Sequence, residues 1–352
     1  MGRKRIVVTT QQEAVLLWPQ RFQDNPYQTA NAKAKNMTTA SDNIKGIGFI
    51  LVAFLIFSLQ NIAVKWIGGG YPVLEIVIFR SFIALPCTLL LFRMEGGLGL
   101  PKTKQPKLEY ARGFFLFISY TTYFMGLAAL HLADVAAIRN SAPLFITFLS
   151  VVVLGEKVGP RRWLALLVGF AGVLLIVRPG STTFNFGSIF VLIATLFYAF
   201  NVMTVRYLRT TDSSATMAYY STLVYLVAAF ILAPLAALVG EVPNAHPSIA
   251  FLFRAWAMPT FTDWLIMSGL GLVWASGMFL TARAYSMAQA SVAAPFEYVA
   301  LLYNVMWGFV IWHEVPTGAM WAGAILTILS GVYILYRERR ERKRPLPATR
   351  FP

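Results

Sequence analysis

The chain is poor in charged residues and in cysteine. Only 13% of its 352 residues are charged, about half the share that a soluble domain carries, whereas 57% are hydrophobic. The single cysteine, Cys87, lies in an apolar run and cannot form an internal disulfide. This composition excludes an ordinary soluble domain and indicates a membrane protein.

The sequence also lacks the residue clusters that common membrane enzymes need. It contains no GxxxxGK[ST] phosphate-binding loop, so we expect no direct hydrolysis of ATP. Its histidines, His131, His246 and His313, stand far apart without a cysteine or paired carboxylate at metal-ligand spacing, and no aspartate cluster is present to hold magnesium. We therefore expect no catalytic residue, no metal and no cofactor, which makes an intramembrane enzyme the weaker alternative.

Acidic residues are half as frequent as basic ones, which gives a formal net charge of +15. Such a charge on a soluble face would suggest nucleic acid, but the apolar runs leave no soluble domain to present that face. Basic residues beside a membrane instead lie against the anionic lipids of the cytoplasmic leaflet. The charge therefore indicates the lipid bilayer as a partner and no nucleic acid.

Ten apolar segments are long enough to cross a bilayer, which takes about 20 residues of α-helix. Turns rich in Gly and Pro, such as GGGYP and RPGS, separate them. The expected fold is an all-α membrane protein with ten transmembrane helices. The expected spans are approximately 47–66, 73–92, 110–130, 134–154, 163–178, 186–206, 217–239, 263–283, 291–312 and 318–336.

Basic residues lie mainly on one side of these spans. With both termini in the cytoplasm, 25 of the 30 Lys and Arg residues, Arg112 among them, fall on the cytoplasmic side, as the positive-inside rule requires. We therefore expect a multi-pass protein with a disordered cytoplasmic tail at 1–44 and a basic cytoplasmic tail at 338–352. Met37 offers a second start besides Met1, and the sequence does not choose between them.

The two halves of the chain contain similar turns. GEKVGPRRW at 155–163 aligns with HEVPTGAMW at 313–321, which superposes Glu156 on Glu314 at an offset of 158. The first turn is basic and the second is not, as expected for equivalent turns on opposite membrane faces. We predict two inverted repeats, at 45–180 and 181–337, which are typical of secondary transporters. Both glutamates are expected to cap helix starts.

These features resemble the drug/metabolite transporter superfamily and its ten-helix EamA-type members. The resemblance covers Lys45 to Arg337 and rests on LGEKV, WHEVP and NSAPLF. The stretch SVAAPFEYVALLYNVMWGFVIWHEVP and the ending GVYILYRER are similar to a bacterial subgroup of riboflavin and S-adenosylmethionine uptake proteins. The resemblance implies an inner-membrane transporter that takes up riboflavin by alternating access. Uptake of S-adenosylmethionine, export of amino acids and related metabolites, and assembly as a homodimer all stay open.

Three charged side chains inside spans are the main site candidates. A charge at the bilayer centre costs about 2.5–3.5 kcal/mol on insertion scales, so it tends to face the bundle interior. Arg80 and Arg139 suit a carboxylate or phosphate of a small-molecule substrate, although Arg139 could instead reach the outer interface. Glu297 could carry a proton or bind a substrate cation, or could be a structural partner of the Tyr298 hydroxyl. Asn140 could bind substrate or join helices.

Amides and aromatic rings complete the candidate site. The polar groups of the first and sixth spans would meet near the axis that relates the repeats, where they could bind a heteroaromatic ring or simply join helices. The rings could stack on a flat substrate or belong to interfacial belts. The polar candidates are Gln60, Asn61, Tyr198 and Asn201, and the aromatic candidates are Tyr120, Tyr123, Trp274, Tyr303 and Trp307.

Overall fold

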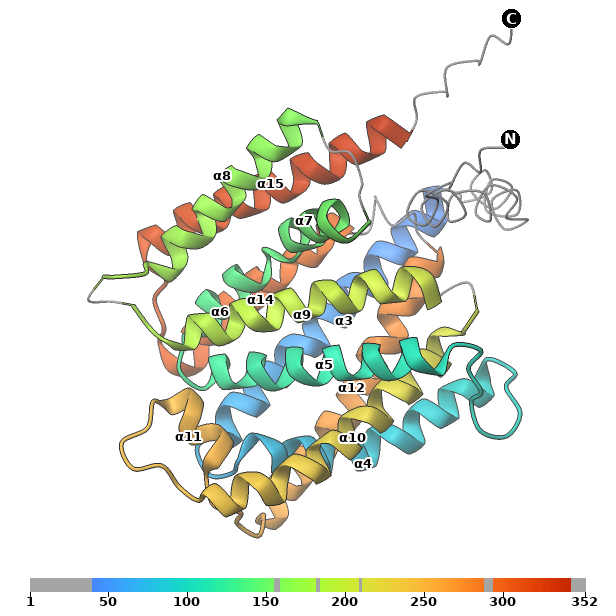
Figure 1. Cartoon of the computed structure of the whole chain (residues 1–352), viewed down its shortest axis with the longest axis vertical. Coiled ribbons are helices and arrows are strands. Elements are labelled where there is room, and N and C mark those ends of the chain that lie inside the picture. The colour runs from blue at the N-terminus through green and yellow to red at the C-terminus, as the bar shows by residue number, and fades with distance from the viewer. Residues whose placement is uncertain (1–39, 155–158, 182–183, 209–210, 288–293, 343–352) are drawn as a thin grey trace, which may run out of the picture.

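A computed structural model describes residues 40–154, 159–181, 184–208, 211–287 and 294–342. These residues form helices and connecting turns, with no strand among them. The helices lie side by side in a bundle (Figure 1). The all-helical fold is the one that the sequence predicts, because a helix satisfies its backbone hydrogen bonds internally where water is absent.

The helices follow the expected spans along the chain. The first half contains α3 (Ala40–Ile67), α4 (Val73–Met94), α5 (Pro106–Leu127), α6 (Leu132–Arg139), α7 (Ala142–Leu154) and α8 (Pro160–Val177). The second half contains α9 (Gly187–Leu208), α10 (Ser214–Val239), α11 (Pro247–Phe253), α12 (Phe261–Met287), the 3₁₀ helix η1 (Ala294–Tyr298), α14 (Val299–Trp312) and α15 (Gly318–Arg342).

Several of these helices have the length and composition of membrane spans. Three more are apolar but shorter, at Trp163–Val177, Phe296–Trp312 and Gly318–Ile334. The chain is thus built to lie in a membrane. Among the described residues, six segments are long and apolar enough to cross one: Ile44–Ile67, Val73–Met94, Leu132–Leu149, Gly187–Val205, Ser214–Val239 and Phe261–Thr281.

Two expected spans are interrupted instead of continuous. The span expected at 134–154 is divided into α6 and α7 at Asn140 and Ser141, just before Pro143. The span expected at 291–312 begins as η1, which contains Pro295, and continues as α14. Proline has no N–H to continue a helix and favours a first turn, which accounts for both interruptions. The expectation of unbroken spans is corrected at these two places.

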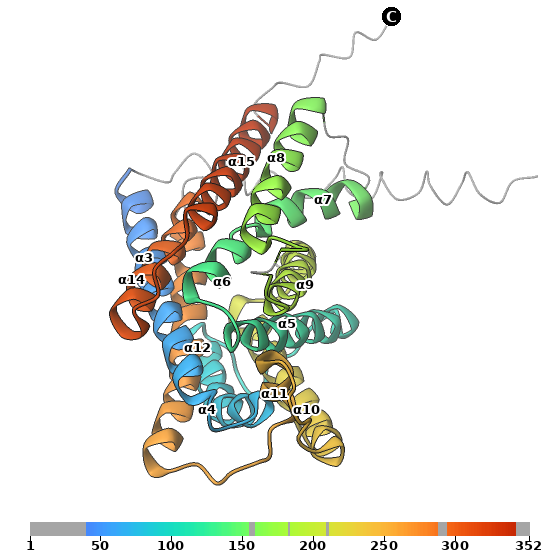
Figure 2. The same cartoon turned by 90° about the vertical axis from the view of Figure 1, so that its left-hand side faces the viewer.

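Helices from the two halves of the chain pack against each other. α3 packs on α12 and α5 on α9, while α4 lies against both α10 and α12. α8 and α15 form a pair at one end of the molecule (Figures 1 and 2). Because each of these pairs draws one member from each half, the halves share a core and are not two separate globular units.

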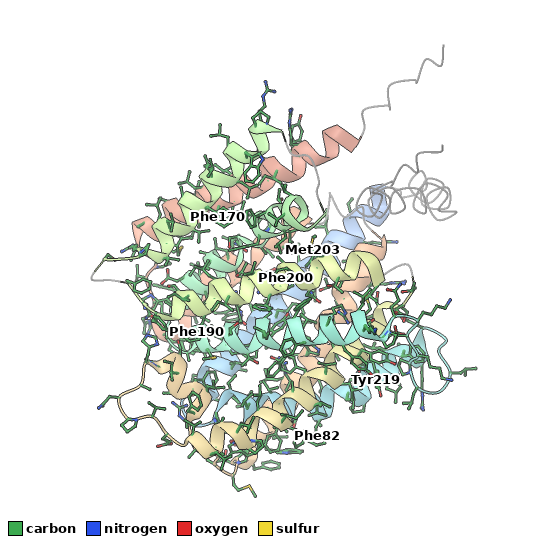
Figure 3. All side chains as sticks on the ribbon, in the orientation of Figure 1. Phe82, Phe170, Phe190, Phe200, Met203 and Tyr219 are labelled. Atoms are coloured by element: carbon green, nitrogen blue, oxygen red, sulfur yellow. The ribbon has the colours of Figure 1, made fainter. Side chains whose placement is uncertain are left out.

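Apolar side chains fill the spaces between helices and also cover the outside (Figure 3). Phe200 and Met203 of α9 belong to a cluster with Leu149 of α7. Phe82 of α4 is 53% exposed and meets Phe230 of α10 edge to face, with ring centres 5.7 Å apart. Exposed rings of this kind suit a surface that contacts lipid.

Small residues let α8 and α15 approach at the level of the backbone. A Cβ added to Gly172 would lie 2.7 Å from the carbonyl oxygen of Gly323 and 2.8 Å from Thr327 Oγ1. Ser330 also donates a hydrogen bond to the carbonyl oxygen of Ala165. Close backbone packing and polar bonds of this type hold helices together in lipid, where the hydrophobic effect between helices is absent.

We expect Gly172→Ala to destabilise the protein by about 1–3 kcal/mol, because the new methyl group would meet the Gly323 backbone, which cannot move aside as a side chain can. The thermal midpoint of the detergent-solubilised protein measures this. Gly269→Ala in α12 is the matched control: a Cβ there meets nothing within 4 Å, so we expect little change or a small gain. If both variants lowered the thermal midpoint equally, the close backbone crossing of α8 and α15 would be contradicted.

Candidate functional site

Two arginines lie among aromatic side chains inside the helix bundle. Arg80, in α4, is 2% exposed. Arg139 is the last residue of α6, directly before the interruption that precedes α7. Rings from α5, α9, α10 and α12 surround the two guanidinium groups. Both charges therefore face the bundle interior, as the cost of burying them in lipid predicts.

Arg139 is held by backbone and hydroxyl groups of two neighbouring helices. Its Nη1 donates to the carbonyl oxygen of Ala194 in α9 at 3.1 Å and to Ser119 Oγ in α5 at 3.3 Å. Its guanidinium carbon lies 4.1 Å from the centre of the Tyr198 ring. A cation over a ring gains about 0.5–2 kcal/mol, and the gain rises with desolvation. The side chain thus points into the bundle, and the alternative of reaching out to the membrane interface is wrong.

Tyr120 of α5 connects the surroundings of the two arginines. Its ring centre lies 4.7 Å from that of Trp274 and 6.5 Å from that of Tyr123. The guanidinium carbon of Arg139 lies 5.9 Å from the same ring, which is also within electrostatic range of Arg80. The sequence-predicted rings of α5, α9 and α12 therefore form one cluster that spans both charges.

Arg80 is enclosed by rings and, within the part of the chain that the structure describes, forms no ion pair with a carboxylate. Its guanidinium carbon lies 4.7 Å from Trp274, 4.8 Å from Tyr225 and 5.6 Å from Phe124. Its Nε and Nη1 are buried without a hydrogen-bond acceptor among the described residues. Each such donor costs about 1–3 kcal/mol. Ring faces stabilise the charge but leave these N–H groups unsatisfied.

Glu297, in η1, lies near two tyrosines of the aromatic cluster. Tyr120 and Tyr198 are both within electrostatic range of its carboxylate. The neighbouring Tyr298 instead directs its hydroxyl against Gly331 of α15, where no described residue bonds to it. Glu297 is therefore not the partner of the Tyr298 hydroxyl, and Tyr298 faces α15 instead of the arginines.

The asparagines of the first and sixth expected spans do not meet. Asn61 of α3 donates from Nδ2 to Asn304 Oδ1 in α14 at 2.9 Å. Asn201 of α9 instead accepts from Arg112 Nη1 at 3.5 Å. The prediction that these amides come together at the axis between the repeats is wrong, because each finds a partner on a different helix.

The remaining polar candidates divide into satisfied and unsatisfied groups. Trp307 donates from Nε1 to Ser58 Oγ at 3.0 Å, which joins α14 to α3. Gln60 Oε1 and Asn140 Nδ2 are buried with no partner among the described residues. Tyr303 lies half-buried on α14. Gln60 and Asn140 thus keep hydrogen-bonding capacity for a ligand, whereas Trp307 has a structural role.

Arg112 belongs to a buried network that the sequence analysis missed. Its place near the basic turn before α5 assigned it to the cytoplasmic surface, yet it is 2% exposed. Its Nε donates to Glu109 Oε2 at 3.1 Å, and its Nη2 donates to Ser221 Oγ and to the carbonyl oxygen of Met217 in α10. Glu109 stands three residues before Arg112, a helical spacing that could have revealed the pair.

A small pocket adjoins Arg80 on the side of α10. Tyr225 comes close to both Arg80 and Thr121 of α5. Neither the Tyr225 hydroxyl nor Thr121 Oγ1 has a hydrogen-bond partner among the described residues. A search for charges inside spans could not find these neutral hydroxyl groups. The pocket is lined by Arg80, Ser81, Ala84, Leu116, Ser221, Thr222, Tyr225 and Trp274.

Lys65 and Glu314 form an ion pair at the end of α3. Glu314 stands between α14 and α15, and its Oε2 accepts the backbone N–H of Leu132 at 2.8 Å. Lys65 also donates to the carbonyl oxygen of Leu130 at 3.0 Å. Glu314 therefore caps the start of α6, a helix other than the one that it precedes. Glu156, which aligns with Glu314 in the predicted repeat, lies outside the described residues.

Known proteins are similar to this chain over most of its length. Residues 44–178 match the EamA-like transporter family. The chain is 30% identical to a riboflavin transporter of Vibrio cholerae over 86% of this chain and 96% of the relative. It is 26% identical to an S-adenosylmethionine uptake transporter of Rickettsia bellii over 84% and 94%, respectively. It is 28% identical to a pseudopaline exporter of Pseudomonas aeruginosa over 81% and 94%.

A solved structure has the same fold. A crystal structure of a protein that is 18% identical to this chain superposes with a TM-score of 0.58. The match covers 86% of this chain and 99% of the other. At this identity the likeness concerns the fold alone, and it includes helices of both halves.

We expect a double-mutant cycle of Lys65→Met and Glu314→Gln to give a coupling energy of about 0.5–3 kcal/mol in the free energy of unfolding, because the pair is mostly buried. Glutamine keeps an acceptor for the Leu132 N–H, so the cycle isolates the charge. The matched control is the more exposed pair of His131 and Asp134, for which we expect a coupling near zero. A coupling energy no larger than that of the His131–Asp134 control would contradict the view that the Lys65–Glu314 pair holds its helices together.

Proposed function

Because the chain belongs to the EamA-like transporter family of the drug/metabolite transporter superfamily, we propose that it is a secondary transporter of a small polar metabolite in the bacterial inner membrane. One observation carries the proposal: the buried Arg80 and the partly buried Arg139 share an aromatic cluster inside an apolar bundle. Buried charges inside membrane bundles mark substrate or ion pathways. The relatives are named as transporters, which supports a transporter over an intramembrane enzyme.

We infer ten spans in two inverted repeats, at 45–180 and 181–337. The first copy comprises α3, α4, α5, α6 with α7, and α8; the second comprises α9, α10, α12, η1 with α14, and α15. The packing supports this pairing. Exchanging the copies turns the α3–α12 contact into α9–α5 and the α4–α12 contact into α10–α5, while the α8–α15 and α4–α10 contacts map onto themselves. A two-fold axis between the copies would produce this exchange.

The offset of 158 residues also recurs between α8 and α15. Thr327 Oγ1 lies 3.4 Å from the carbonyl oxygen of Gly169, its own partner at that offset. A residue that contacts its repeat partner lies at the axis between the repeats. Arg178, which ends α8, donates to Thr317 just before α15, so the two helices run antiparallel. This is the sense expected of inverted copies.

The interrupted helices support alternating access. Arg139 and Glu297 stand 158 residues apart, and each lies at an interruption of its span. In secondary transporters, discontinuous helices near the midplane form the substrate site, and the repeats rock about it. Under this proposal a gradient or downhill flux powers the movement.

The helix ends support cytoplasmic termini. The start of α3 and the end of α15 lie on the same side of the molecule (Figure 1). An even number of spans places both ends of the helix bundle on the same side of a membrane. The excess of Lys and Arg in the turns on that side agrees with the positive-inside rule.

For the substrate we propose riboflavin or S-adenosylmethionine, which two of the relatives are named as carrying. Both compounds contain a flat heteroaromatic ring. The rings of Tyr120, Tyr123, Tyr198 and Trp274 could stack on it, since aromatic side chains supply large, rigid contact areas. Because another relative is named as a pseudopaline exporter, export of a related metabolite is the alternative direction of transport.

We expect Tyr198→Leu to lower uptake by about tenfold or more, whereas Tyr198→Phe should retain most of it, because the ring and not the hydroxyl contacts Arg139 and a flat substrate. The assay is uptake of labelled riboflavin and S-adenosylmethionine by proteoliposomes that contain the purified full chain. Tyr110→Leu, an exposed ring on α5, is the control and should behave as wild type. Wild-type vesicles that accumulate neither compound would exclude both substrates.

We expect Glu297→Gln to flatten the dependence of uptake on pH, because the amide cannot exchange a proton. Initial rates at several pH values, with and without an imposed proton gradient, measure this. Glu241→Gln, on an exposed turn, is the control. A variant with the rate and pH profile of wild type would remove Glu297 from the coupling mechanism.

A further inference from the structure

We propose that Arg80, Tyr225 and Thr121 bind a carboxylate group of the transported metabolite. The inference rests on the proposed transport function and concerns the chemical class of the substrate. It assigns the anionic group to the buried donors that α4, α5 and α10 bring together beside the pocket, and the ring to the tyrosines around Arg139. The substrate class is then a metabolite with both a flat ring and a carboxylate.

The donors at this pocket match a carboxylate in number and kind. Arg80 Nε and Nη1, the Tyr225 hydroxyl and Thr121 Oγ1 are all buried with no partner in the described part of the chain. Tyr225 lies beside both of the others. A carboxylate presents about four lone-pair positions, so it can accept hydrogen bonds from several donors at once. A neutral carbonyl or hydroxyl group would leave part of this donor set unsatisfied.

No carboxylate of the described residues forms an ion pair with Arg80. The second buried arginine nearby, Arg112, has its charge balanced by Glu109. The hydroxyls of Ser221 and Thr222, which line the same pocket, already donate to carbonyl oxygens of α10 itself. The pocket therefore offers a positive charge and free donors, and a ligand must supply the negative charge.

Arg139 is the less suitable anchor for an anion. Its Nη1 already donates to Ser119 and to the carbonyl oxygen of Ala194, and its guanidinium carbon lies over Tyr198. These contacts orient Arg139 as part of the aromatic cluster. Trp274, whose ring centre lies 4.7 Å from both the Arg80 guanidinium carbon and the Tyr120 ring centre, joins the two places.

The assignment separates the two substrate candidates. S-adenosylmethionine carries a carboxylate and a flat ring, whereas riboflavin has the ring but no carboxylate. Burying riboflavin at this site would leave the Arg80 charge without a counterion. The pocket therefore favours the S-adenosylmethionine class over the neutral vitamin.

Uptake by proteoliposomes tests the inference with three labelled probes: S-adenosylmethionine, decarboxylated S-adenosylmethionine and riboflavin. We expect wild type to prefer the carboxylated compound over its decarboxylated partner by about tenfold or more, since charge-assisted bonds are the strong ones. Arg80→Met should abolish this preference, and Arg80→Lys should keep part of it. Tyr225→Phe, which retains the ring over Arg80, should reduce the preference by less than Arg80→Met does.

The outcomes separate this inference from the proposed function. Equal uptake of the two S-adenosyl compounds, or uptake of riboflavin alone, would overturn the carboxylate site while leaving a transporter. A preference that survives in Arg80→Met would overturn it as well. Uptake of none of the three probes would overturn the proposed substrates and the inference together.

Thermal unfolding without substrate gives an independent test. If Arg80 serves a ligand, Arg80→Met removes a buried unpaired charge, so its melting temperature should equal or exceed that of wild type. Arg112→Met is the matched control and should melt lower, because it leaves Glu109 buried without its partner. An Arg80→Met protein that loses as much as Arg112→Met would make Arg80 a structural residue and overturn the inference.

Discussion

A guanidinium enclosed in an apolar bundle must find its counterparts within the protein or in a ligand, and the interior of this molecule is arranged around that constraint. Arg112 finds a carboxylate and oxygens of α10, which makes it a fastening between helices. Arg139 finds backbone and hydroxyl oxygens and a tyrosine face. Arg80 finds only rings for part of its N–H groups. The contacts of Arg112 and Arg139 therefore stabilise the fold, whereas the unsatisfied N–H groups of Arg80 destabilise it.

The unsatisfied Arg80 lies where the two halves of the chain meet. The rings around Arg80 and Arg139 come from α5, α9, α10 and α12, so helices of both halves contribute to one cluster. A displacement of one half against the other would change the distance between a cation and its rings. Because cation–ring attraction is strongest within about 6 Å, such a movement alters the stability of the charge directly. The site and the motion of the helices are thus physically linked.

Hydropathy and charge predicted the helices and the buried charges, but not the partners of the side chains. Arg80, Arg139 and Glu297 stand out because a charge in an apolar run has few alternatives to facing the interior. Arg112 was assigned to the surface, since its partners in α10 are distant in sequence. The hydroxyl of Tyr225 gave no signal, because a neutral polar group in a helix is compatible with structural bonds or with none.

The proposed symmetry between the two halves extends to their packing but not to the charges at the candidate site. The crossing of α8 and α15 brings Thr327 to Gly169, its partner in the proposed repeat, so the two proposed copies are alike there. Arg139 and Glu297 are partners at the same offset and carry opposite charges. A symmetric pair of cations would repel each other and would bind only an anion. In the proposed transporter, Glu297 would instead suit a positive charge of the substrate whose carboxylate Arg80 binds.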